Sequence, residues 1–272
     1  MRRGGRRPAT ATAMSSMSAR QAKAALPESE RPGLWPWPQV RDYFALNHKQ
    51  GEHVSAEGPN GSGKTTLMLE LLIERGQRRA ANGRPAHVTI LETKRRDKTM
   101  EGLLGLGWKR ITRIDEWPPA YGEEHVVVWP PAGDLRTRAD RMKAFFETVL
   151  AEIDESGAQI LYIDEAATFS LPKPDGFGFR GYLNNYWKES RSNGISLFAG
   201  TQRPVDVPRP MWSEPYWLFL FRPEDEDDLK RVAELSGSKQ LVLEVLPQLD
   251  HHQFLMLRRR PERIAVVSEV EF

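Results

Sequence analysis

The chain contains no cysteine among its 272 residues. Disulfide bonds and thiolate metal sites are therefore excluded, and the composition is compatible with a reducing cytoplasm. Histidine is scarce, and the only adjacent pair, His251–His252, makes a poor metal site because neighbouring side chains point in different directions. No stretch approaches the roughly 20 apolar residues of a membrane-spanning helix, so we expect no direct membrane span.

Most of the chain also has no large excess of positive charge. Residues 1–33 carry seven basic groups and two acidic ones, a surplus of +5, whereas the whole chain has a net charge of +2. The remainder therefore sums to −3, which excludes a uniformly basic surface for nucleic acid. Any attraction to DNA must come from local patches or from the N-terminal segment.

Large apolar residues are rare in residues 1–33, which are rich in Arg, Ala, Ser and Thr. Such a segment cannot offset its ordering entropy by burial, so we expect a disordered basic tail. It suits a basic arm on nucleic acid, a solvated tail or an organelle transit peptide, and Met14 or Met17 is an alternative start. Residues 34–272 are of a suitable length for one sizeable α/β domain.

One glycine-rich stretch supplies the strongest functional signal. Gly58, Gly63, Lys64 and Thr65 match the phosphate-binding pattern G-x-x-x-x-G-K-[ST]. Glycines let the backbone N–H groups turn toward phosphate oxygens, and the helix that follows adds its positive dipole end. Lys64 is expected to bridge the β- and γ-phosphates, and the Thr65 hydroxyl to ligate Mg²⁺. The predicted ATP-binding residues are Gly58, Pro59, Asn60, Gly61, Ser62, Gly63, Lys64, Thr65 and Thr66.

Apolar runs alternate with helical patterns along the rest of the chain. We expect buried strands at residues 87–91, 124–129, 159–163, 195–199 and 216–221, and a closing hairpin at 253–257 and 263–269. Residues 135–154 show an amphipathic helical period with Asp134 as N-cap, and Gly76 is expected to cap the helix after the glycine-rich loop. This alternation predicts a mostly parallel central sheet flanked by helices.

Two carboxylates follow the apolar run at 159–163. A buried strand that delivers Asp164 and Glu165 at its end is the Walker B arrangement. Asp164 is expected to hold Mg²⁺ through water, together with Thr65. Glu165 is expected to polarise a water for attack on the γ-phosphate, which predicts an ATPase.

Gln202 follows the strand at 195–199. Its amide is predicted to sense the γ-phosphate or to orient the water, provided that this strand lies between the other two. Lys64 is the only fixed cation of the predicted site, so a further cation must come from elsewhere. Arg191 and Arg203 are the candidates, and either is equally compatible with a solvated surface charge.

The segment Arg191-Ser-Asn-Gly-Ile-Ser-Leu-Phe-Ala-Gly-Thr-Gln-Arg-Pro204 resembles the R-x-x-G-I-x-L-x-x-A-T-Q-R-P segment of the FtsK/HerA superfamily of DNA-pumping ATPases. Gly200 stands where alanine is usual, and Glu92-Thr93-Lys94 resembles the D-x-K of that family's second strand. The loop Gly58–Thr66 also resembles that of ABC-transporter ATPases, but residues 147–157 lack their LSGGQ-type signature.

This resemblance implies a RecA-like ATPase domain of the ASCE class that forms a homo-oligomeric ring, usually a hexamer, around double-stranded DNA. Glu165 would be the catalytic base, Gln202 the γ-phosphate sensor, and Arg191 or Arg203 the finger supplied in trans. The length best fits a viral packaging ATPase, with a capsid or portal-vertex partner, or a mobile-element translocase. We expect a location in the host cytoplasm or in association with the virion.

Two further expectations concern partners. The loop 170–180, which follows Walker B, carries Lys173 and Arg180, and is predicted either to contact DNA phosphates or to be a plain surface connection. The alternative function is that of a Zot-like assembly or secretion factor acting on protein or on a virion, although such proteins carry a membrane segment. A nucleotide switch with little turnover does not need Glu165.

Overall fold

A computed structural model describes residues 31–78, 83, 86–120, 122–131 and 135–271, and the side chains of 135–137 are excluded from that description. The proposed N-terminal tail, apart from its last three residues, and the proposed cap Asp134 lie outside the described residues. The strands are β1 (Gly33–Leu34), β2 (Val54–Glu57), β3 (His87–Leu91), β4 (Lys109–Ile111), β5 (His125–Val128), β6 (Gln159–Ile163), β7 (Ser196–Thr201), β8 (Trp217–Phe221), β9 (Gln253–Arg258) and β10 (Ile264–Glu269). The helices are α2 (Trp37–Asn47), α3 (Lys64–Gly76), α4 (Lys98–Gly105), α5 (Leu135–Ser156), α6 (Ala166–Ser170), α7 (Arg180–Glu189), α8 (Pro210–Ser213), α9 (Glu226–Leu235) and α10 (Lys239–Val245), with short 3₁₀ turns between some of them.

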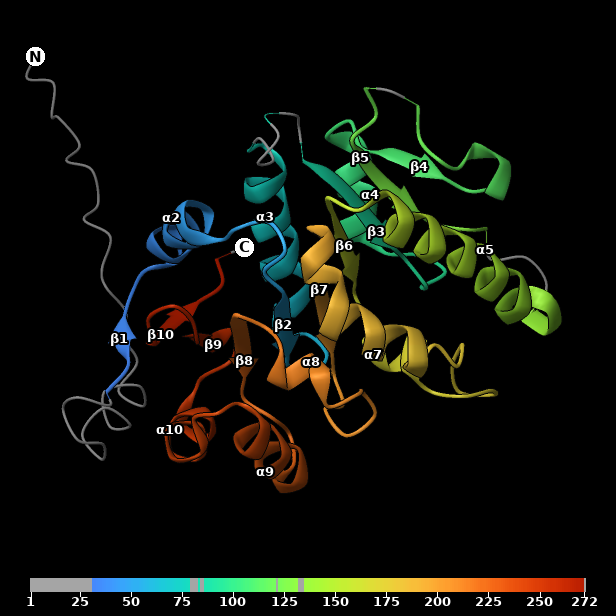
Figure 1. Cartoon of the computed structure of the whole chain (residues 1–272). Coiled ribbons are helices and arrows are strands. Elements are labelled where there is room, and N and C mark those ends of the chain that lie inside the picture. Colours follow the sequence, from blue (N-terminus) through green and yellow to red (C-terminus); the bar gives the residue numbers. More distant parts are fainter. Residues whose placement is uncertain (1–30, 79–82, 84–85, 121, 132–134, 272) are drawn as a thin grey trace, which may run out of the picture.

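All ten strands form one sheet in the order β1-β10-β9-β8-β2-β7-β6-β3-β5-β4. From β8 to β4 every neighbouring pair is parallel, whereas β9 runs antiparallel to both β8 and β10 (Figure 1). The closing hairpin predicted from the sequence is therefore confirmed, and it extends the parallel sheet at one side.

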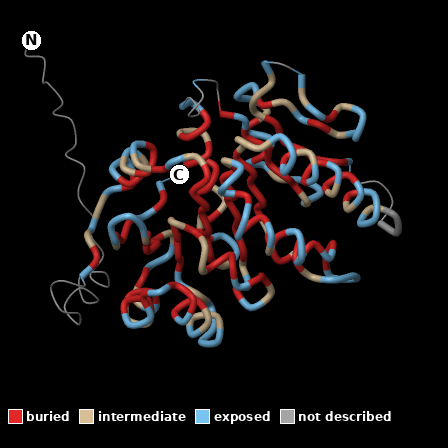
Figure 2. Tube along the Cα trace, viewed as in Figure 1, coloured by how far each residue is buried: buried red, intermediate tan, exposed pale blue. Residues whose placement is uncertain are grey.

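Both faces of the central strands are buried, as their continuous apolar runs require. Along β6, Ile160 and Tyr162 point into a core shared with α2, α3 and α4. Leu161 and Ile163 point into a second core, which is built with α5 to α10. Figure 2 shows buried backbone running through the central strands, with exposed segments on the outer helices. This sandwich of helices around a mostly parallel sheet confirms the predicted fold class.

The strand register places four loops together at one edge of the sheet. Glu57, the last residue of β2, pairs with Thr201, the last residue of β7. Ile163, which ends β6, pairs with Ala199 of β7 and with Leu91, the end of β3. Because parallel strands all end at the same edge, the segments that follow β2, β7, β6 and β3 are neighbours.

Some features of the fold differ from the sequence expectations. Gly76 is the last residue of α3 and not its left-handed cap, because α3 packs closely on β5: a Cβ there would lie 2.9 Å from His125 Nε2. The pattern also missed β4, α10 and the helix α2, in which Trp37 is buried and donates to Glu70 at 2.7 Å. Among the described residues, no helix is both long and apolar enough to cross a membrane.

Two histidines are buried beside the central strands in their neutral form. His48 Nδ1 accepts a hydrogen bond from Arg75 Nε at 3.3 Å, and His53 Nδ1 accepts one from the Leu197 amide at 3.1 Å. Burial, reinforced by neighbouring cations, lowers the pKa of His48 to about 3 and that of His53 to about 4, from 6.5. Protonation of either ring therefore favours the unfolded chain.

The free energy of unfolding should consequently decrease on acidification. Stability that is present above pH 6.5 is lost as the pH falls toward the folded pKa, and each histidine should contribute a loss of about 1.4 kcal/mol between pH 7.5 and 5.5. In His53→Gln the amide oxygen can accept the Leu197 bond but cannot titrate, so this variant should lose about 1.4 kcal/mol less over that range. Urea unfolding followed by circular dichroism measures this difference, and identical pH dependences would contradict it.

Candidate nucleotide-binding site

The glycine-rich loop connects β2 to α3 and has the backbone that phosphate binding needs. Gly61 and Gly63 adopt φ values of 77° and 96°, in the left-handed region that favours glycine. Gly58 is required for a different reason, since a Cβ there would lie 2.8 Å from Phe221 Cβ. The first turn of α3 therefore presents free backbone N–H groups and the positive end of the helix dipole.

The side chains of this loop surround the expected phosphate position. Lys64 begins α3 and is buried, and Thr66 follows in the same turn. Pro59, Asn60 and Ser62 line a cleft of about 390 Å³ that extends toward the loop after β8 and the turn before β9. In that turn, His252 Nδ1 lies 3.2 Å from the Ser62 carbonyl oxygen.

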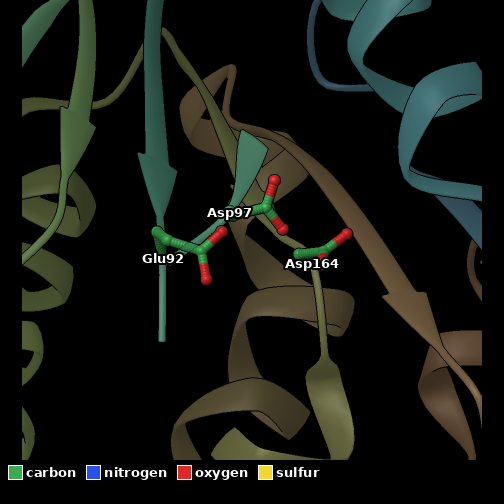
Figure 3. Close-up of side chains that lie close together, drawn as sticks. All are labelled: Glu92, Asp97 and Asp164. Atoms are coloured by element: carbon green, nitrogen blue, oxygen red, sulfur yellow. The ribbon is translucent and has the colours of Figure 1, made fainter. Parts of the chain in front are cut away.

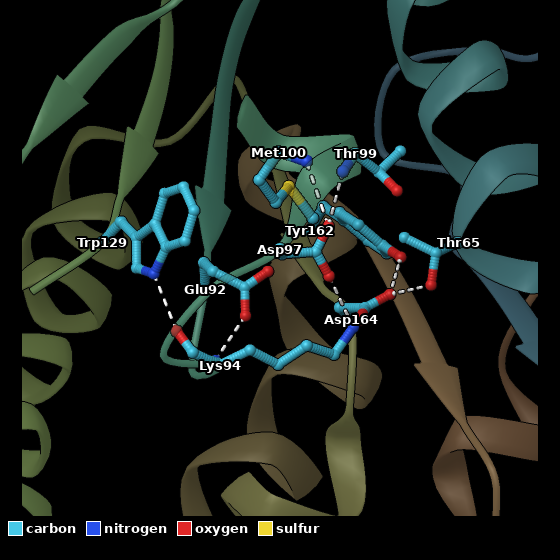
Figure 4. A network of polar contacts seen from close by, with 9 residues as sticks. All are labelled: Thr65, Glu92, Lys94, Asp97, Thr99, Met100, Trp129, Tyr162 and Asp164. Atoms are coloured by element: carbon cyan, nitrogen blue, oxygen red, sulfur yellow. Dashed lines mark hydrogen bonds and ion pairs between the residues drawn. The ribbon is translucent and has the colours of Figure 1, made fainter. Parts of the chain in front are cut away.

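Asp164, directly after β6, lies at the centre of a hydrogen-bond network (Figure 4). Its Oδ1 accepts from the Thr65 hydroxyl at 2.8 Å and from the Tyr162 hydroxyl at 2.5 Å, and its Oδ2 accepts from Lys94 Nζ at 2.5 Å. Burial opposes ionisation of Asp164, but Lys64 and Lys94 nearby lower its pKa below the usual value. This carboxylate is therefore charged at neutral pH.

The donor set around Asp164 fits Mg²⁺. Thr65 Oγ1 and Asp164 Oδ1 come from different elements and already touch, and both are the hard oxygen ligands that Mg²⁺ prefers. Magnesium is usually held by one or two protein oxygens together with phosphate oxygens and water. The pairing predicted from sequence, Thr65 with Asp164, is thus brought together by the fold.

Glu165 is positioned by two hydrogen bonds to one of its oxygens. Oε1 accepts from the Ala167 amide at 3.3 Å, which caps α6, and from the Thr201 hydroxyl at 3.0 Å. Oε2 is buried and has no hydrogen-bond partner in the described part of the chain. Burial raises the pKa of Glu165 above the usual value, as suits a general base.

The strand β7 does lie between β2 and β6, which is the condition set for Gln202. Gln202 directly follows Thr201 and lines a second cleft with Glu57, Asn60 and Arg203. The residue of this segment that contacts Glu165 is Thr201, which the sequence motif did not single out. In the sequence, the only indication that Thr201 belongs to the site is its position at the end of the strand, next to Gln202.

The two candidate arginines lie at opposite edges of the sheet. Arg203 is exposed at the edge of its own phosphate-binding loop. Arg191 precedes β7, so the six-residue strand, about 20 Å long, separates it from that edge. Its guanidinium lies 4.7 Å from the centre of the Tyr216 ring. Arg191 therefore cannot act on the site of its own chain.

Comparisons with known proteins concern the fold. No family model matches the chain, and no curated protein matches its sequence. The genome packaging NTPase B204 from Sulfolobus turreted icosahedral virus 2, in complex with ATP-γS, matches with a TM-score of 0.58 and 16% identity, over 83% of this chain and 100% of that one. VirB4 of Thermoanaerobacter pseudethanolicus matches with a TM-score of 0.58 and 14% identity, over 81% and 89%.

The chain therefore shares its fold with these two solved structures. The cytoplasmic domain of the type VII secretion ATPase EccC of Thermomonospora curvata also matches, with a TM-score of 0.51 and 14% identity, over 80% of this chain and 25% of that one. The mostly parallel sheet flanked by helices, which the sequence predicted, is thus confirmed, whereas phosphate binding by the glycine-rich loop stays a prediction.

Three carboxylates, those of Glu92, Asp97 and Asp164, gather at this edge of the sheet (Figure 3). Glu92 follows β3, Asp97 caps α4, and one oxygen of each lies within 4.8 Å of the others and of an Asp164 oxygen. Glu92 is fully buried, and burial raises its pKa to about 7. Lys94 neutralises part of this charge, since its Nζ also lies 2.9 Å from Asp97 Oδ2.

Gly200, the departure from the family pattern, has a steric reason in this chain. A Cβ at Gly200 would lie 2.6 Å from the Asp164 carbonyl oxygen and 3.4 Å from Lys64 Cδ. The backbones of β6 and β7 approach here more closely than a side chain allows. Glycine is therefore needed where the family pattern has alanine.

Gly200→Ala should destabilise the protein by about 1–3 kcal/mol, because β6 or β7 must shift to relieve the contact. Thermal unfolding measures the change. Gly181→Ala is the matched control: a Cβ there meets no atom within 4 Å, and helix propensity in α7 should make that variant neutral or slightly more stable. Equal melting temperatures for the two variants would contradict this account.

Proposed function

We propose that this protein is an ATP-hydrolysing motor that forms a ring and translocates double-stranded DNA, in the manner of a viral packaging ATPase. The observation that carries the hydrolytic part is the pairing of Thr65 with Asp164 beside Glu165, which has one oxygen fixed and the other without a partner. Two matching structures support it: B204 of Sulfolobus turreted icosahedral virus is a DNA-packaging ATPase, and the genome packaging NTPase B204 of Sulfolobus turreted icosahedral virus 2 was solved with ATP-γS.

In this proposal each side chain has one task. Lys64 and the N-terminal amides of α3 hold the β- and γ-phosphates. Thr65 and Asp164 hold Mg²⁺, which neutralises phosphate charge when it is bound. Glu165 accepts a proton from the attacking water through Oε2, while Thr201 and Ala167 keep the carboxylate in place. Gln202 senses the γ-phosphate from the end of β7.

The placement of the cations supports a ring. Lys64 is the cation that the described residues supply at the γ-phosphate, and a second one lowers the barrier to phosphoryl transfer. Arg191 lies at the opposite edge of the sheet, so it can reach only the site of a neighbouring copy. Arg203 lies beside its own site and faces Asp225 and Asp228 across the second cleft. We propose Arg191 as the first candidate for the finger supplied in trans.

The two basic residues of the loop after Walker B that were expected to contact DNA, Lys173 and Arg180, differ in their surroundings. Lys173 forms an ion pair with Asp140, so its charge is already balanced. Arg180 begins α7 and lines a cleft of about 380 Å³ together with Lys188, Arg209 and a single carboxylate, Glu214. None of these three cations has a carboxylate within ion-pair distance in the described part of the chain. We propose this basic cleft, Arg180–Lys188–Arg209, as the contact for DNA phosphates.

ATP hydrolysis should be stimulated by linear double-stranded DNA and lost in two variants for different reasons. Lys64→Ala should abolish nucleotide binding, whereas Glu165→Gln should bind ATP and hydrolyse it about 10²–10⁴-fold more slowly, because the amide cannot accept the proton. Phosphate release and nucleotide binding, measured on the same samples, separate the two defects. Glu101→Gln, the same change at an exposed position on α4, should behave as the wild type.

Removing the charge of Arg180 or Arg209 should weaken DNA binding and make it less sensitive to salt. Each neutralised phosphate contact contributes roughly 0.9 to the slope of log affinity against log salt, so Arg180→Ala and Arg209→Ala should each reduce that slope by about one. Lys173→Ala is the control, since this lysine is paired with Asp140 and should leave the slope unchanged. Fluorescence anisotropy with a labelled duplex gives the slopes. A loss in Lys173→Ala alone would refute the placement of the contact.

The alternative is an assembly or secretion factor that acts on protein. It is favoured by the similarity to EccC, which is described as a type VII secretion ATPase. Hydrolysis that is abolished by Glu165→Gln but indifferent to DNA would support this second function. Under the first function, the ring acts in the host cytoplasm on a capsid or portal-vertex protein, and co-sedimentation with capsids provides the assay.

A further inference from the structure

Lys94 contacts Asp164, the carboxylate that would hold Mg²⁺ under the proposed function. Hydrolysis itself does not need this contact. Its ammonium lies 2.5 Å from Asp164 Oδ2 and 2.9 Å from Asp97 Oδ2 (Figure 4). Asp164 Oδ1 already accepts the hydroxyls of Thr65 and Tyr162. Lys94 thus occupies the other oxygen of the carboxylate that, under the proposed function, faces Mg²⁺.

Two hydrogen bonds hold the backbone of Lys94 in place, whereas its partly exposed side chain has room to change rotamer. Its N–H donates to Glu92 Oε1 at 2.5 Å, and its carbonyl accepts from Trp129 Nε1 at 2.8 Å. The side chain is 41% exposed, and its four methylene groups give it several rotamers. The ammonium can therefore change partners while the backbone stays in place.

A second acceptor for the ammonium lies close by. Glu92 is 0% exposed, and its Oε2 is a buried oxygen without a hydrogen-bond partner in the described part of the chain. One carboxylate oxygen each of Glu92, Asp97 and Asp164 lies within 4.8 Å of the other two, and Figure 3 shows the three side chains close together. A buried carboxylate oxygen that lacks a partner is costly, so a cation that reaches it is stabilised.

We propose that Lys94 is a tethered counter-ion that competes with Mg²⁺ for Asp164 and moves to Glu92, while still held by Asp97, when Mg²⁺ and ATP bind. The inference rests on the proposed function. With Mg²⁺ and the Lys94 ammonium both on Asp164, the two cations would repel each other. With neither present, the three neighbouring carboxylates would repel one another. The exchange keeps the charge balanced in both states and sets the Mg²⁺ concentration at which the nucleotide is held.

Lys94→Met should lower the Mg²⁺ concentration required for half-maximal nucleotide binding, because the competing ammonium is gone. We expect a decrease of roughly three- to tenfold, the range of one partly exposed charge-assisted contact. The measurement is the fluorescence of a methylanthraniloyl-labelled ATP, titrated with Mg²⁺ on the full chain. Arg95→Met is the matched control: it removes the same charge from the adjacent exposed position and should change the value much less.

Glu92→Gln should act in the opposite direction, because it removes the alternative partner and leaves Lys94 on Asp164. The Mg²⁺ requirement should rise about threefold or more. In the double variant Lys94→Met/Glu92→Gln this increase should vanish, since Glu92 acts through Lys94. If Glu92 acted on the metal through its charge alone, the increase in the Mg²⁺ requirement would persist in the double variant.

The outcomes are distinct. The exchange is supported if the Mg²⁺ requirement falls in Lys94→Met and rises in Glu92→Gln, and if the double variant has the same requirement as Lys94→Met. Equal Mg²⁺ requirements in Lys94→Met and Arg95→Met, or an undiminished Glu92→Gln effect in the double variant, overturn this inference and leave the proposed function intact. A wild-type chain that shows no Mg²⁺-dependent nucleotide binding overturns the proposed function, and the inference with it.

Discussion

The parallel register of β2, β7 and β6 is the constraint on which the site depends. Pairing of Glu57 with Thr201, and of Ile163 with Ala199, brings the ends of these strands to one edge. The glycine-rich loop after β2, the acid pair Asp164–Glu165 and the end of β7 then meet without any further adjustment. A shift by one residue would turn each strand's side chains to the opposite face and separate these groups.

Buried carboxyl groups are concentrated at this edge of the sheet. Glu57, Glu92 and Asp164 are buried there, and burial raises the pKa of both Glu57 and Glu92. Lys64 and Lys94 balance part of this charge. Under the proposed function, Mg²⁺, an arginine of a neighbouring copy and the movement of Lys94 would each add or redistribute positive charge beside these carboxyl groups.

Much of the architecture was predictable because the signals were local. The strand at 87–91 was expected at its observed bounds, and the phosphate-binding loop followed from residue types at fixed spacing. The role of Gly76 was predicted wrongly, since its neighbour His125 lies on a distant strand. One partner each of Asp164 and Glu165 was missed for the same reason: Lys94 and Thr201 approach them only through the sheet.

The sequence by itself determined which groups are available to this protein: a glycine-rich loop with the phosphate-binding pattern and an acid pair at the end of a buried strand, on a mostly parallel sheet. These follow from spacing and periodicity, which act over a few residues. Only the tertiary structure decided which groups touch. It put β7 between β2 and β6, placed Arg191 at the far edge, and joined Lys94 to Asp164 across 70 residues of chain. Such contacts depend on strand order and packing, which no local pattern encodes.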